Sequence, residues 1–103
     1  MRFIQECVRH RRILWTYYVN MRLKGRFIPR DDILDAVESY EIVEAYPKDK
    51  YLPSYLVLAK SGSEPFHVLF GADLEGGNVR VVTVYRPSRE EWGDDLRTKR
   101  ATR

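Results

Sequence analysis

The sequence predicts an α+β fold in which two to three N-terminal helices pack on one face of an antiparallel meander of about four strands. Apolar residues recur at helical spacing through the first third of the chain. After Ser39 the pattern changes to short β-prone runs, and short turns separate these runs. Strands joined by short turns pair in antiparallel fashion, and we expect the sheet's second face to stay partly open for binding.

Helical patterns come first. Residues 3–10 form an apolar stripe at i, i+4 spacing, and residues 17–26 repeat that period. Between them, residues 13–16 are a brief β-prone run. Pro29 marks a break, and a third helix opens at Asp31, where negative charge is favoured in a first turn.

Four strands are expected over residues 40–46, 54–60, 66–73 and 79–86. Gly76-Gly77 predicts the hairpin turn before the last strand. Ser88 and Glu91 have capping-box spacing, which predicts a short helix around residues 89–92. Residues 1–103 are expected to form a single domain with a frayed tail over 97–103. The predicted core comprises Val19, Leu23, Ile33, Val37, Leu56, Leu58, Val68, Phe70, Val82 and Val84.

Composition excludes several classes of protein. The chain has 103 residues, of which 44% are hydrophobic, so it can fill a core. A single cysteine excludes an internal disulfide and zinc sites that need several thiolates. No apolar run is long enough to span a bilayer, and no signal-peptide pattern opens the sequence. We therefore expect a cytoplasmic protein with no metal and no cofactor.

Charge is strongly segregated along the chain. Residues 1–30 contain eight basic residues and one acidic residue, whereas residues 31–75 contain ten acidic and three basic residues. Most of the basic residues are arginine, whose planar guanidinium suits phosphate. This segregation indicates either a surface for RNA, DNA or an acidic protein, or an ordinary solvated surface whose charges pair across the fold.

Two groups of residues could carry chemistry. His67 lies in a predicted strand. It is either a half-buried histidine that makes a hydrogen bond, or a general acid or base. Tyr18, Arg22 and Arg26 fall on one helical stripe, which is either a solvated face or a phosphate-binding stripe with a stacking tyrosine. Cys7 and His10 have helical spacing, but a lone cysteine on an apolar stripe is typical of a core.

Motifs along nearly the whole chain resemble a bacterial and archaeal family that is known only as a domain of unknown function. They are Ile13-Leu14-Trp15-Thr16-Tyr17-Tyr18, Arg22, Arg26, Tyr46-Pro47, Pro53-Ser54, Pro65-Phe66-His67-Val68, Val82-Thr83-Val84-Tyr85, Trp92 and Asp94-Asp95-Leu96-Arg97-Thr98-Lys99-Arg100. That family is distantly similar to the RelE-like and BrnT-like toxins of toxin–antitoxin pairs, many of which cleave mRNA on the ribosome without a metal.

The resemblance implies a RelE-like fold and a toxin-like protein that interacts with RNA. The most specific activity that it implies is that of a metal-independent endoribonuclease. His67 or Tyr18 would then move protons, and Arg22 and Arg86 would stabilise charge on the phosphorane. In the family a histidine usually stands where this chain has Tyr18. The RNA-binding residues would be Arg11, Arg12, Arg22 and Arg26.

A second hypothesis from a different class stays open. In it the chain is a non-enzymatic interaction module that keeps the toxin-like fold without catalysis. Its charged faces would bind a protein partner or a second copy of the chain, whereas the first hypothesis implies RNA, the ribosome or an antitoxin-like protein as partners. Neither hypothesis involves a membrane.

Overall fold

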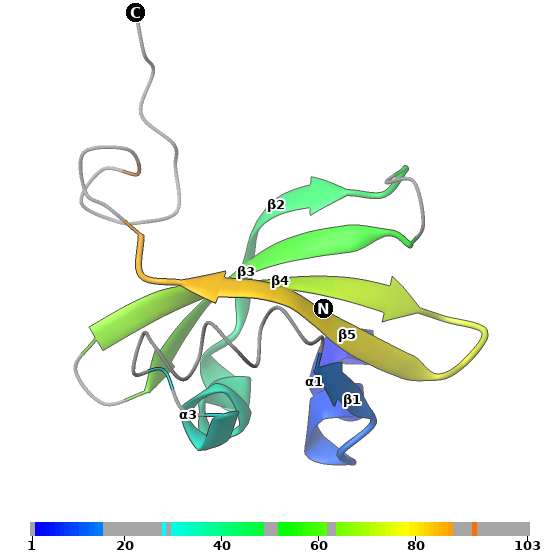
Figure 1. The fold of residues 1–103 in the computed structure, drawn as a ribbon, viewed down its shortest axis with the longest axis horizontal. Coiled ribbons are helices and arrows are strands. Elements are labelled where there is room, and N and C mark those ends of the chain that lie inside the picture. Colours follow the sequence, from blue (N-terminus) through cyan, green and yellow to red (C-terminus); the bar gives the residue numbers. More distant parts are fainter. Residues whose placement is uncertain are drawn as a thin grey trace, which may run out of the picture.

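A computed structural model describes residues 2–15, 28, 30–48, 52–61, 64–87 and 92. Within them, a five-stranded sheet carries short helices on one face (Figure 1). The elements are α1 (Arg2–Arg9), β1 (Ile13–Trp15), α3 (Arg30–Asp35), the 3-10 helix η1 (Ala36–Ser39), β2 (Glu41–Tyr46), β3 (Ser54–Ser61), β4 (Glu64–Asp73) and β5 (Asn78–Tyr85).

The sheet is mixed, with the strand order β1-β5-β4-β3-β2. Strands β2 to β5 pair as antiparallel neighbours, while β1 pairs parallel to β5, with Ile13 opposite Val79. The prediction of an antiparallel meander of about four strands under two to three helices, in the RelE-like arrangement, is therefore wrong. The parallel strand was missed because its three residues pair with the far end of the chain, which no local pattern records.

The individual elements lie close to their predicted positions. The bounds of α1 and of β2 to β5 differ from the predicted ones by at most two residues. Two short helical segments, α1 and the continuous α3–η1 segment, occur among the described residues. The helix predicted over residues 17–26 lies outside the described part of the chain, as does most of the one around 89–92; Trp92 itself is helical.

The main core lies between the helices and the sheet. Ile4 and Val8 of α1 and Ile33 of α3 are buried against an apolar layer of β3, β4 and β5. Tyr40, directly after η1, packs its ring 5.5 Å from that of Phe70. Its hydroxyl donates a 2.7 Å hydrogen bond to the Ile33 carbonyl, and burial raises its pKa above the ordinary value for tyrosine.

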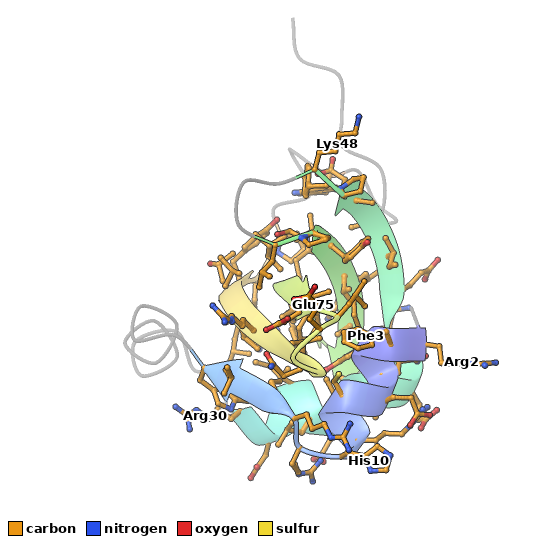
Figure 2. All side chains as sticks on the ribbon, turned by 90° about the vertical axis from the view of Figure 1, so that its right-hand side faces the viewer. Arg2, Phe3, His10, Arg30, Lys48 and Glu75 are labelled. Carbon is orange, nitrogen blue, oxygen red and sulfur yellow. The ribbon has the colours of Figure 1, made fainter. Side chains whose placement is uncertain are left out.

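Polar contacts attach α1 to η1. The Arg9 guanidinium donates to the Glu38 carboxylate at 2.9–3.1 Å, and Gln5 Nε2 donates to the Val37 carbonyl at 2.9 Å. Both side chains of the ion pair are solvent-exposed, so the pair adds little stability. Figure 2 shows that Arg2 projects from α1 away from the sheet, whereas Phe3 lies on the side that faces the strands.

A β-bulge in β5 sets which side chains reach each face of the sheet. Leu69 lies opposite Thr83, but Phe70 lies opposite Val81, so Val82 is the extra residue. Simple alternation would place Val82 and Val84 together on one face. After the bulge the alternation shifts by one residue, and Val84 joins the buried residues of the helix-covered face.

Most of the predicted core is confirmed. Ile33, Leu56, Leu58, Val68, Phe70 and Val84 are buried. Val37 is half-buried and packs against the core, whereas Val82 is 39% exposed, so its assignment to the core is wrong. Val19 and Leu23 lie outside the described residues. No helix in the described ranges is long and apolar enough to cross a membrane.

The bulge makes Val84 and Val82 a matched pair for mutation. Val84→Ala should lower the free energy of unfolding by about 2 kcal/mol, because it leaves a cavity at a fully buried site. Val82→Ala should change it by less than about 0.5 kcal/mol, because the residue is 39% exposed and lies outside the core. Urea unfolding followed by circular dichroism measures both. Equal losses in the two variants would contradict the assigned bulge.

Candidate functional site

His67 lies at the centre of an aromatic cluster on the sheet face opposite α1. The register places it on β4 between Leu58 of β3 and Tyr85 of β5. Its Nδ1 is 3.2 Å from the Tyr85 hydroxyl oxygen, and its ring meets Trp92 edge-on at 4.6 Å between centroids. Leu56, Leu58 and Trp92 form a second, smaller core here. The bulge brings Tyr85 to this face.

Burial limits what His67 can do. The residue is 0% exposed, so a substrate cannot reach it while Tyr85 and Trp92 hold these positions. A general acid or base must come within hydrogen-bonding reach of the reacting group, directly or through one water. In this geometry His67 joins β4 to β5 through the Tyr85 hydroxyl and contacts the ring of Trp92.

Arg86 lies at the same end of the sheet. It follows β5, is exposed, and donates a 3.4 Å hydrogen bond from Nη1 to the Pro65 carbonyl. Pro65 precedes His67 by two residues on β4. The structure therefore brings Arg86 to the same strand ends as His67, with the guanidinium at the surface and the imidazole inside.

The turn between α1 and β1 holds a second set of arginines. Arg11 adopts a left-handed backbone conformation with φ of 61°. The Arg12 amide donates to the Cys7 carbonyl and the Arg11 amide to the Val8 carbonyl, at 2.8 and 3.1 Å. This is the Schellman pattern that ends a helix, and its left-handed position is normally occupied by glycine. Arginine at that position carries a steric cost of about 1 kcal/mol.

The chain continues from this turn into β1, which pairs along β5 at the edge of the described sheet. The Arg12 carbonyl accepts a 3.0 Å hydrogen bond from the Val79 amide, and a Cβ on Gly77 would lie 4.0 Å from Arg12 Nη1. Leu14, which is 50% exposed, lies opposite Arg80 in the parallel register. We call Arg11, Arg12, Leu14 and Arg80 the arginine patch. Arg80 also lies 4.0 Å from Asp73, which screens part of its charge.

Part of the sequence matches a known protein family. Residues 15–86 match the family described as Domain of unknown function (DUF4258). The chain belongs to this family. The match spans β2 to β5 and includes His67 and Tyr85, while α1 and the α1–β1 turn precede it. Searches of curated proteins and of solved structures find no match.

The family assignment confirms the resemblance to a domain of unknown function. The further similarity to RelE-like and BrnT-like toxins stays a prediction. Among the proposed site residues, Tyr18, Arg22 and Arg26 lie outside the described part of the chain. Arg12 bonds to Val79, which lies opposite Ala72, five residues from His67 on β4, so its backbone lies roughly 17 Å from that of His67. The structure thus does not bring Arg11 and Arg12 to His67.

Sequence reasoning missed Tyr85, Trp92 and Arg80. Simple alternation assigned Tyr85 to the face of Val79 and Val81, and only the bulge places it opposite His67. Trp92 belongs to the motifs that resemble the family, but nothing in the sequence assigns it to the His67 cluster. Arg80 had a detectable signal, because it is a charged residue in an otherwise apolar strand and therefore needs a solvated surface.

The other candidate nucleophile does not form a site. Cys7 is buried, its Sγ contacts the Gly77 carbonyl at 3.6 Å, and burial raises the pKa of its thiol. His10 is exposed and pairs with Glu6 at 3.2 Å. A protonated, buried thiol is a poor nucleophile. Within the described ranges, no group of three or more His, Cys, Asp or Glu residues is arranged to hold a metal ion.

The hydroxyl of Tyr85 provides a direct test of the buried cluster. Tyr85→Phe should lower the free energy of unfolding by about 1 kcal/mol, because His67 Nδ1 loses a buried hydrogen-bond partner. Tyr46→Phe is the matched control, since its hydroxyl contacts Glu44 at the exposed edge and should contribute almost nothing. Chemical denaturation measures both. A silent Tyr85→Phe would mean that this hydrogen bond does not support the fold.

Proposed function

We propose that this protein binds single-stranded RNA through the arginine patch, without chemistry at His67. The observation that carries the proposal is Arg11 in a left-handed conformation. A left-handed backbone conformation is uncommon in residues other than glycine, and such outliers are enriched at functional sites. An arginine at this turn, beside Arg12, places guanidinium groups at the surface, where they can pair with phosphate.

The rest of the patch supports the same function. Arg80 lies on β5 opposite Leu14 of β1, so charged and apolar surface lie next to each other at this edge of the sheet. Guanidinium groups bind phosphates and stack on bases, and exposed apolar side chains contact unstacked bases of single strands. RNA recognition that rests on arginine contacts needs no buried histidine.

The burial of His67 supports binding over cleavage. Metal-independent cleavage by His67 would need its imidazole beside a ribose 2′-hydroxyl, and the ring is enclosed by Tyr85 and Trp92. We expect RNA to remain intact after long incubation with the protein and EDTA. Cleavage that His67→Ala abolishes and Arg2→Ala retains would instead restore the endoribonuclease hypothesis.

Salt dependence tests the patch directly. Fluorescence anisotropy of a labelled single-stranded RNA should show affinity that falls as salt rises, by about 0.7 in logarithmic slope per phosphate contacted. The double variant Arg12→Ala/Arg80→Ala should flatten that slope by about 1.4. Arg2→Ala is the control, because Arg2 projects from the far end of α1 (Figure 2). Absence of binding at low salt, or equal slopes in both variants, would refute the proposal.

Arg11→Gly separates stability from binding. Glycine fits the left-handed position without steric cost, so the variant should gain about 0.5–1 kcal/mol in free energy of unfolding. The same change removes a guanidinium and should weaken RNA binding. Denaturation and anisotropy on one preparation measure both effects. A variant that gains stability and keeps full affinity would show that Arg11 takes no part in binding.

A further inference from the structure

An apolar pocket opens on the helix-covered side of the sheet, away from the arginine patch. It measures about 130 Å³ and is lined by Phe3, Ile4, Ile42, Tyr55, Ala72 and Leu74. Ile4 and Ala72 are buried and form its floor. Leu74, at 66% exposed, and Ile42, at 36%, lie at its rim. Large apolar side chains exposed around an apolar pocket indicate a binding surface.

The pocket borders the edge of the sheet. In the described sheet, β2 pairs only with β3, so it is an edge strand, and all of its residues are exposed or half-buried. An edge strand presents unpaired backbone groups that can pair with another extended segment. A register shift at Val43 divides β2 into two short stretches. Backbone pairing along this edge is therefore short, and a side-chain pocket is needed to fix the register of a bound segment.

The two faces of β2 present different chemistry. Ile42 lies opposite Val57, which is buried on the helix-covered face, and it lines the pocket. Glu44 lies opposite Leu56 of the other face, where it contacts the Tyr46 hydroxyl. A segment added along β2 alternates its side chains in the same way. One side chain can enter the pocket while its neighbours in sequence point to the side of Glu44.

We propose that β2 binds an extended segment of a partner protein, in which one large apolar residue fills the pocket and Lys or Arg residues flank it. The pocket volume suits one such side chain, since a cavity of about 150 Å³ accommodates benzene. The flanking cations complement Glu44. A second copy of this chain is a poorer occupant through β2 itself, because both strands would carry Glu41 and Glu44 and bring like charges close together.

The proposal concerns a surface separate from the arginine patch and does not depend on RNA binding. A blocked peptide, Lys-Thr-Lys-Leu-Lys-Thr-Lys, is the probe, titrated into isotopically labelled full-length protein and followed by NMR. The amide signals of β2 and of Leu74 should shift. Replacing the central leucine of the peptide by serine, or its lysines by glutamates, should weaken binding at least about fivefold.

Protein variants locate the site. Leu74→Ser and Glu44→Lys should each weaken peptide binding at least about fivefold. Leu14→Ser is the matched control, because it removes another exposed leucine, at the opposite edge of the sheet, and should leave peptide binding unchanged. Each variant's amide spectrum first confirms that it is folded.

Three results would overturn the proposal. The first is that β2 signals do not move at the highest peptide concentration. The second is that Leu74→Ser and Leu14→Ser bind the peptide equally. The third is that β2 signals shift with protein concentration in the absence of peptide, which would make a second copy of the chain the occupant of the edge.

Discussion

The extra residue at Val82 is the constraint on which the arrangement of both faces depends. With strict alternation, Val84 would leave the core and Tyr85 would turn toward the helices. The bulge reverses both positions, so Val84 fills the main core and Tyr85 meets His67. One inserted residue thus completes two clusters at once, since a shift of one residue in a strand exchanges its faces.

The cluster around His67 shows how an ionisable residue is accommodated inside a small domain. Burying an imidazole is costly unless its nitrogens find hydrogen-bond partners. Here Tyr85 supplies one partner, and the rings of Tyr85 and Trp92 surround the imidazole edge-on. The same enclosure that makes His67 structurally useful withholds it from a substrate.

The local sequence pattern predicted most of the helices and strands in the described residues, because their positions depend on residues that are close in sequence. Turn residues such as Gly76-Gly77 fixed the strand limits, and the i, i+4 stripe found α1. The parallel pairing of β1 left no such signal, since its partner lies at the other end of the chain. The bulge was equally hidden. Residues 81–84 are all β-branched, so no alternation of apolar and polar residues shows which of these side chains face the core.

The candidate site was less predictable than the fold, because it depends on contacts between residues that are far apart in sequence. His67 was found by residue type alone, but its burial depends on Tyr85, whose face the bulge decides, and on Trp92 from the chain's last segment. Arg11 and Arg12 were chosen for charge. What distinguishes Arg11 is its backbone conformation, which follows from the way α1 must end before β1 can begin.

The two edges of the described sheet carry different charged residues. Arg11 and Arg12 precede β1, which pairs with β5 beside Arg80, while Glu41 and Glu44 lie on β2 at the opposite edge. Three strands separate these edges, so an RNA phosphate and a cationic peptide would bind without competing for the same groups. A nucleic acid approaching β2 would meet glutamate, and a basic peptide approaching β1 would meet arginine. Under the two proposals, each edge would repel the ligand that the other attracts, and this difference would keep the two surfaces independent on one small sheet.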